Sequence, residues 1–184
     1  MKKIVLGACI LFSLATMLSV SGQDEKIPIV WKNPAKNFRE GQCYAFGFSQ
    51  DENAYKFLLQ IKALDKLLAN ENAVLALYLD TDNNSSTGRF RNKGWDLQLN
   101  LLLKRQTLSA IVWEENKVKT SYSFSTGEFS IKPDLDNNML YITVKKNIYL
   151  KNIKINRKFV LFEEHSDGKN TERSLMDGVE INLK

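Results

Sequence analysis

The sequence predicts an all-β protein that is built as an antiparallel β-sandwich in one domain. Segments in which apolar and polar residues alternate recur along the chain, and a period of two is typical of strands with one buried face. Turn residues separate these segments, and no stretch has the length and periodicity of a major helix. Many short strands at such spacing are typical of a two-sheet sandwich.

The first half of the chain contains four predicted strands and one helical turn. The segment 55–68 supports a strand by its alternation and a helix by its composition and the spacing of its larger apolar residues. We therefore expect a strand to about Ala63 and a helical turn over 64–70. The segment 73–79 is apolar throughout, which predicts a strand that is buried on both faces. The four predicted strands span 27–31, 41–49, 55–63 and 73–79.

The clearest alternation in the second half covers residues 95–103, where apolar residues occupy one face and Asp96, Gln98 and Asn100 the other. The apolar residues are Trp95, Leu97, Leu99, Leu101 and Leu103. A hairpin is expected around Glu115-Asn116, because turn residues separate two strand-like segments there. The predicted strands of this half span 95–103, 108–114, 117–125, 127–132, 140–144, 158–163 and 179–183.

Residues 1–22 have the features of a secretory signal peptide. A basic start is followed by an apolar stretch over 4–20 and by small residues up to Gly22. We expect cleavage before Gln23, a mature sandwich domain over 23–184, and a secreted or periplasmic location. An uncleaved membrane anchor is disfavoured because the stretch is short and no basic stop-transfer cluster follows it. A lipoprotein at Cys9 ranks second, since the apolar region before Cys9 is too short.

Composition excludes several classes of function. The net charge is +5, or +3 without Lys2 and Lys3, which is too mild to indicate nucleic-acid binding. Cys43 is the one cysteine of the mature chain, so an internal disulfide and a cysteine-rich zinc site are excluded. The single histidine, His165, lies in a predicted turn without the partners of a catalytic triad. A carboxylate pair of the glycosidase type stays open, because the chain has 21 acidic residues.

A cluster of oxygen-bearing side chains follows the predicted strand 73–79. Asp80, Asp82 and Asn84 are spaced so that a curled loop can direct their oxygens at one centre, as calcium requires. An EF-hand is rejected, because Ser85 replaces the required glycine and Arg91 the required glutamate. The same residues also form plain Asx-rich turns, so the spacing alone is compatible with both interpretations.

Two further ligands complete the predicted calcium site. Asp96 can fold back onto the loop because Gly88 and Gly94 permit tight turns, and the backbone carbonyl of Ser86 stands at the seventh position. The full predicted ligand set is Asp80, Asp82, Asn84, Ser86 and Asp96. Without a cation, up to three carboxylates in one loop would repel each other.

The motif over residues 78–96 resembles a segment of the family 9-like carbohydrate-binding modules and the related DOMON-like domains of bacterial extracellular proteins. The shared pattern is a strand that ends in Asp-x-Asp-Asn, a Thr-Gly, and a Gly-x-Asp that opens the next strand. Ser85 is a departure, because the family often has proline there. The resemblance implies a jelly-roll-like antiparallel sandwich that often binds structural calcium and sugars.

Aromatic residues supply the predicted sugar contacts. Trp113 has the opposite parity from its apolar neighbours and is expected to be exposed, whereas Trp95 is expected in the core. We expect a secreted, non-catalytic, calcium-stabilised module that binds an oligo- or polysaccharide. The alternatives are a cell-envelope structural or protein-interaction domain without a sugar ligand, and a carboxylate-dependent glycan-active enzyme.

Overall fold

The computed structural model describes residues 26–71, 73–82, 84, 86–88 and 94–147, together with the backbone of residues 157–166 and 170–174. The predicted signal peptide (1–22) and the last predicted strand (179–183) lie outside the described residues. Within the described part of the chain, no helix has the length and apolar character that a membrane span requires.

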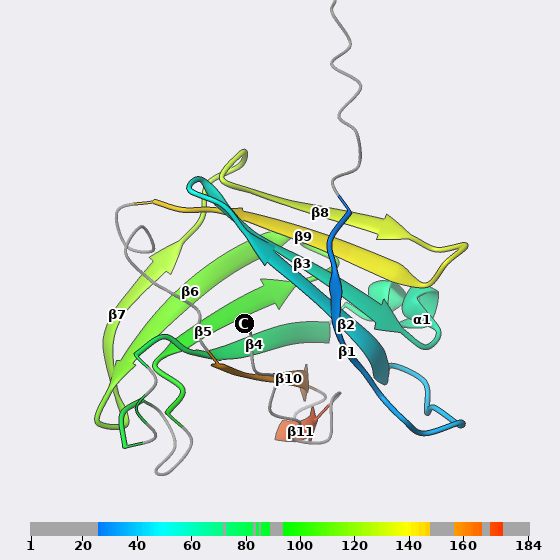
Figure 1. The fold of residues 1–184 in the computed structure, drawn as a ribbon, viewed down its shortest axis with the longest axis horizontal. Helices are drawn as coiled ribbons and strands as arrows, with labels where there is room; N and C mark the ends of the chain where they lie inside the picture. Colours follow the sequence, from blue (N-terminus) through cyan, green and yellow to red (C-terminus); the bar gives the residue numbers. More distant parts are fainter. Residues whose placement is uncertain are drawn as a thin grey trace, which may run out of the picture.

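The described strands form two antiparallel sheets, which confirms the predicted all-β sandwich (Figure 1). The first sheet has the order β1-β2-β3-β9-β8, with β1 (Ile29–Lys32), β2 (Cys43–Gln50), β3 (Ala54–Ile61), β9 (Met139–Lys145) and β8 (Phe129–Asp134). The second has the order β11-β10-β4-β5-β6-β7, with β11 (Asn170–Ser174), β10 (Arg157–Ser166), β4 (Ala73–Asp80), β5 (Leu97–Leu102), β6 (Thr107–Glu114) and β7 (Lys117–Ser123).

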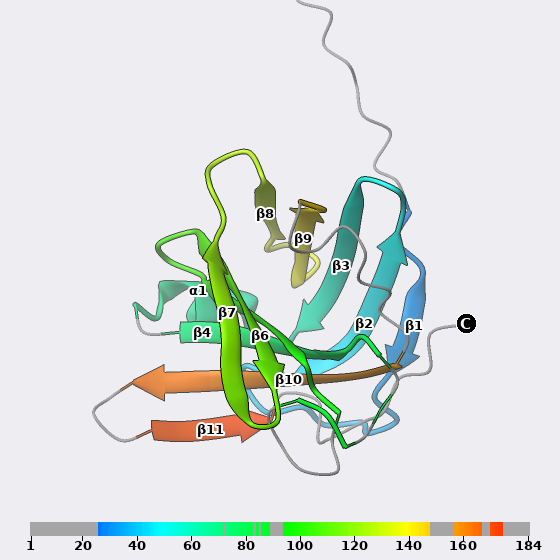
Figure 2. The same cartoon turned by 90° about the vertical axis from the view of Figure 1, so that its left-hand side faces the viewer.

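The main hydrophobic core lies between the two sheets, which face each other as two layers (Figure 2). The sheet that contains β2 and β3 contributes aromatic side chains together with aliphatic ones, and the sheet that contains β4 and β5 contributes alternate leucines. The largest fully buried side chains of the two sheets are Phe46, Tyr55, Phe57, Leu59, Ile61, Leu75, Leu77, Leu79, Leu97 and Leu99. Each such burial stabilises the fold by about 1.5–3 kcal/mol, so the core can hold the sandwich together without a disulfide.

The segment that allowed two interpretations contains both a strand and a helix. β3 ends at Ile61, and the short helix α1 (Leu64–Ala69) follows, as predicted. Ala63 has a φ of 55°, a left-handed conformation that ends the extended backbone before the helix. Leu64 and Leu67 of α1 are buried, so the helix closes one end of the core (Figure 1).

Two details of the strand prediction are wrong. β5 begins at Leu97, and Trp95 packs with Ala76 and Tyr78 in a second cluster rather than with the leucines of the main core. Trp95 is buried as predicted, at 6% exposure, but it does not share the leucine face. The strand β11 was not predicted, because Asn170–Ser174 is a polar edge strand without an apolar alternation.

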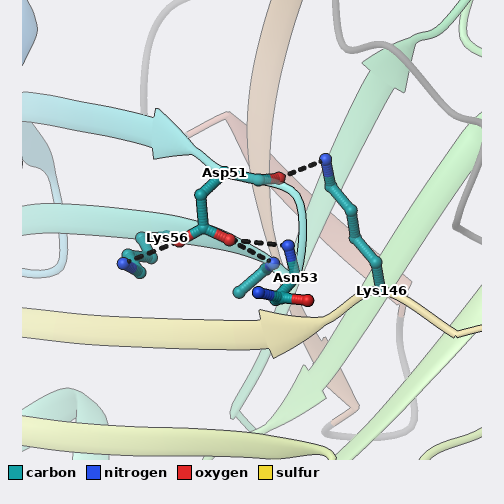
Figure 3. Close-up of polar contacts among 5 residues, drawn as sticks. Asp51, Asn53, Lys56 and Lys146 are labelled. Atoms are coloured by element: carbon teal, nitrogen blue, oxygen red, sulfur yellow. Dashed lines mark hydrogen bonds and ion pairs between the residues drawn. The ribbon is translucent and has the colours of Figure 1, made fainter.

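The β2–β3 turn shows how short polar segments fix the sheet register. The Asp51 carboxylate accepts hydrogen bonds from the backbone N–H groups of Asn53 (2.7 Å) and Ala54 (2.8 Å) and pairs with Lys56 Nζ at 3.0 Å (Figure 3). Lys146, which follows β9, donates from Nζ to the Asp51 carbonyl oxygen at 2.6 Å. The Lys56 hydrogen bond and the two N–H groups lower the pKa of Asp51 to about 2.

Candidate functional site

The loop between β4 and β5 contains the predicted metal ligands and is held together by side-chain hydrogen bonds. Asp96 Oδ1 accepts from the Thr81 N–H at 2.8 Å, and the Thr81 hydroxyl donates to Asp96 Oδ2. Asp82 Oδ1 accepts from the Asn84 N–H at 2.9 Å. The Thr87 hydroxyl lies 3.0 Å and 3.1 Å from the two carboxylate oxygens of Asp82. Asp96 therefore folds back onto the loop, as predicted.

Asn84 and Ser86 contact each other in this loop, whereas Asp80 lies at the end of the preceding strand. Asn84 Oδ1 accepts from the Ser86 N–H at 3.0 Å and from the Ser86 hydroxyl at 2.6 Å, which is an Asx-turn contact at an exposed position. Asp80 is the last residue of β4 and is only 3% exposed. In the strand register, Asp80 stands opposite Arg157 of β10.

The electrostatics of the loop are compatible with a cation. Burial raises the pKa of Asp96; hydrogen bonds from Thr81 oppose this rise, and the nearby Asp82 carboxylate adds to it. Among the described residues, no three His, Cys, Asp or Glu side chains converge closely enough to hold a metal ion by themselves. A calcium ion here would need amide or carbonyl oxygens, such as those of Asn84 and Ser86, in addition to carboxylates.

A close backbone contact fixes the loop against the start of β5. Gly88 has a φ of 81°, and a Cβ atom at this position would lie 2.8 Å from the Asp96 nitrogen and closer still to the Trp95 carbonyl group. The Gly88 carbonyl oxygen accepts from the Asn116 N–H at 2.9 Å, which ties the loop to the β6–β7 turn (Figure 1). Only glycine fits both the left-handed conformation and the space available.

The outer face of the second sheet carries a strip of uncharged side chains over β5, β6 and β7. The register places Gln98 opposite Ile111, and Asn100 opposite Ser109. Opposite residues of an antiparallel pair share a face, and the alternate leucines of β5 point into the core, so these residues lie on the other side. We define the outer strip as Gln98, Asn100, Ser109, Ile111, Trp113, Ser121 and Ser123.

Trp113 is held in the outer strip by a chain of side-chain hydrogen bonds. Its Nε1 donates to Gln98 Oε1 at 3.1 Å, and Gln98 Nε2 donates to Asn100 Oδ1 at 2.7 Å. Gln98 is buried at 5% exposure, whereas Trp113 and Asn100 are half-buried. A register shift between Val112 and Trp113 marks a bulge, a feature that commonly redirects a side chain.

The outer strip begins where the predicted metal loop ends. The backbone N–H of Trp113 donates to the Asp96 carbonyl oxygen at 2.8 Å, so the residue with the predicted sugar contact is bonded to a predicted metal ligand. The alternation of β5 indicated that Gln98 and Asn100 face outward, but nothing in the sequence marked them as partners of Trp113. Their role depends on the β5–β6 register, which is a tertiary property.

The described residues offer little support for nucleophilic chemistry. The Cys43 thiol is buried, donates to the Ala45 carbonyl oxygen at 3.2 Å, and has a pKa raised by burial to about 12. Such a thiol stays protonated and cannot act as a nucleophile at neutral pH. The prediction that His165 lies in a turn is wrong: His165 lies in β10, where only the backbone is described.

Comparisons with protein-family models, with curated proteins and with solved structures found no match to this chain. The resemblance to carbohydrate-binding modules therefore rests on the motif at residues 78–96. The geometry of the loop and of the outer strip has to support any functional conclusion by itself.

Proposed function

We propose that this protein is a secreted, non-catalytic module that binds carbohydrate on the outer strip and is stabilised by calcium in the loop between β4 and β5. The observation that supports sugar binding most directly is the chain Trp113–Gln98–Asn100. It combines a partly exposed indole with amide groups that are fixed by hydrogen bonds.

The chemistry of this chain suits a sugar ring. An indole offers an apolar face to the C–H groups of a pyranose, and amides can both donate to and accept from its hydroxyls. The hydrogen bond from Trp113 Nε1 restricts rotation of the ring before a ligand arrives, which reduces the entropy lost on binding. Asn100, which is half-buried, takes part in this chain through Oδ1.

The calcium component of the proposal rests on Asp96, which is half-buried and lies close to the Asp82 carboxylate. A cation that is shared by Asp82 and Asp96 would relieve their repulsion and favour the ionised form of Asp96. Asp80, Asn84 and the Ser86 carbonyl are the other oxygen donors that this loop offers. The ion would supply structural stabilisation, and the proposal assigns it no catalytic step.

A binding experiment tests the sugar component. The protein without residues 1–22 is screened on a glycan array, and its best ligand is titrated by calorimetry. Trp113→Ala should lower the affinity for the glycan at least tenfold. Trp113→Phe keeps an aromatic ring but loses the N–H donor, so its affinity should lie between those of the parent protein and Trp113→Ala. Leu135→Ala is the matched control, because it removes an apolar side chain that is 52% exposed in the β8–β9 turn.

Three outcomes would contradict the proposal in different parts. If no glycan binds, the interaction-domain alternative is favoured. If Trp113→Ala binds as well as the parent protein, the outer strip is not the site. If a bound glycan is cleaved, and the cleavage is lost in a carboxylate variant, the protein is an enzyme.

A thermal melt tests the calcium component. At a free calcium concentration a hundredfold above the dissociation constant, binding to the folded state would add about 3 kcal/mol of stability. This corresponds to a rise in Tm of roughly 6–12 °C for a domain of this size. Asp82→Ala should abolish the difference between calcium and chelator. An identical Tm in both conditions, with no calcium found by elemental analysis, would leave the loop as an Asx-rich turn.

A further inference from the structure

Two rows of registered positions across the second sheet contain no residue that is charged at neutral pH. One row runs through Val160, Tyr78, Gln98, Ile111 and Ser121. The next row runs through Ser174, Phe162, Ala76, Asn100, Ser109 and Ser123. At β4 this face is not accessible to a ligand, because Ala76 and Tyr78 are buried in a cluster with Trp95. Over β5, β6 and β7 the residues are half-buried or exposed, apart from the buried Gln98.

The lack of charge contrasts with the composition of the protein. Charged residues make up 26% of the chain, so about three of these eleven positions would carry a charge at random. The chain is also basic, with a net charge of +5. Charged side chains flank the outer strip: Glu114 pairs with Lys119 at 3.0 Å in the exposed β6–β7 hairpin, and Asp96 lies two residues before Gln98.

The neutral rows restrict the ligands that this surface can take. A carboxylate or sulfate that is brought against the outer strip would lose water without gaining a cationic partner there, which is unfavourable. Hydroxyl groups find suitable partners in Asn100 and in the serines, each of which can donate and accept. The strip crosses three strands and is therefore about 10 Å wide, which matches a disaccharide unit.

We infer that the outer strip binds an uncharged glycan, with Trp113 stacking on one sugar ring and Asn100, Ser109, Ser121 and Ser123 supplying hydrogen bonds to hydroxyls. This inference rests on the proposed sugar-binding function and adds the chemical class of the ligand. Uronic-acid and sulfated polysaccharides are excluded as ligands of this surface, despite the basic character of the protein as a whole.

The test compares a neutral oligosaccharide with a charged counterpart. Isothermal titrations use gluco- and manno-oligosaccharides and, in parallel, oligomers of the corresponding uronic acids, at 50 and 500 mM NaCl. The neutral series should contain the ligand, and the uronic-acid form should bind at least tenfold more weakly. The neutral affinity should change less than twofold between the two salt concentrations, because no charge pair is screened.

The same inference can be tested by adding a positive charge to the outer strip. Ser121 is exposed in the middle of the edge strand β7, so Ser121→Lys should leave the fold intact. This variant should strengthen binding of the uronic-acid oligomer at least threefold at 50 mM NaCl and lose that gain at 500 mM. Ser125→Lys, exposed just beyond β7, is the control for a general rise in positive charge and should show no such gain.

The results of these titrations distinguish a failure of the neutral-glycan inference from a failure of the proposed sugar-binding function. Tighter binding of the uronic-acid form by the parent protein, lost in Trp113→Ala, would overturn the neutral-glycan inference and leave sugar binding intact. Failure of both series, on the array and by calorimetry, would overturn the proposed function itself. A dimer that dissociates in Trp113→Ala would show that a second copy of the chain covers the outer strip, and would overturn both.

Discussion

Replacement of Gly88 by alanine should weaken the fold far more than the loss of flexibility alone would explain. Gly88 is buried in the loop between β4 and β5, and its φ of 81° lies in the left-handed region. An alanine Cβ would overlap the Trp95 carbonyl group and would lie 2.8 Å from the Asp96 nitrogen. These are backbone atoms, so no side-chain rotation can make room.

The expected cost has two parts. The left-handed conformation costs an alanine about 1–2 kcal/mol relative to glycine. Relief of the overlap requires the backbone at Trp95 and Asp96 to move, and overpacking of this kind costs about 1–3 kcal/mol. That movement also strains two hydrogen bonds of Asp96, from its N–H to the Leu79 carbonyl and from the Trp113 N–H to its own carbonyl. The total is about 2–5 kcal/mol, or a fall in Tm of roughly 4–20 °C.

Gly127→Ala separates the two parts of this cost. Gly127 also has a positive φ, 92°, but a Cβ there would meet nothing within 4 Å. Its substitution should therefore cost only about 1–2 kcal/mol. Urea unfolding of both variants gives the comparison directly. Equal losses of stability for Gly88→Ala and Gly127→Ala would refute the view that the loop is packed against Trp95.

Two further predictions concern titratable groups. Burial raises the pKa of the Cys43 thiol to about 12. In the folded protein without residues 1–22, this thiol should therefore react with a disulfide reagent at pH 8 at least a hundredfold more slowly than in the same protein unfolded in urea. Equal rates in the two states would contradict the buried placement of Cys43. The pKa of Asp51 is lowered to about 2, mainly by Lys56, so its contribution to stability is present above the unfolded pKa near 3.8 and is lost as the pH falls through about 2. Asp51→Asn should therefore be less stable than the parent protein at pH 7, by no more than about 1 kcal/mol because the group is exposed, and the difference should vanish near pH 1.5. A difference that persists at pH 1.5 would assign it to the turn geometry instead of to the charge.

Much of the fold follows from local patterns. The alternation of β5, the continuous apolar run of β4 and the turn at Glu115-Asn116 each predict their element, because side-chain periodicity depends on the strand itself. The turn residues Glu115 and Asn116 have φ values of 48° and 64°, as a tight hairpin requires. The order of strands within each sheet was not predicted, since it depends on pairings between distant segments.

The candidate site could be predicted less completely than the fold. The calcium site over Asp80, Asp82, Asn84, Ser86 and Asp96 stays a prediction, and what the structure adds is that Asp96 bonds back to Thr81 at the start of the loop. Trp113 was expected to be exposed and is half-buried, because its indole N–H bonds to Gln98 on the neighbouring strand. That contact requires the β5–β6 register and the bulge before Trp113, and neither has a signature in the sequence.

The position of β10 in the second sheet affects how easily the chain aggregates while it folds. β10 pairs with β4 along eight registered positions, yet five strands lie between them in the sequence. Until residues 157–166 have been synthesised and docked, β4 has a partner only in β5, and its other edge has open backbone groups. Seven of its eight residues are buried in the finished fold, so this unfinished edge is apolar and well suited to pairing with another chain. The interval between synthesis of β4 and arrival of β10 is therefore the period in which the protein is most exposed to aggregation. A chaperone that protects this protein would have most to gain by covering β4 during that interval.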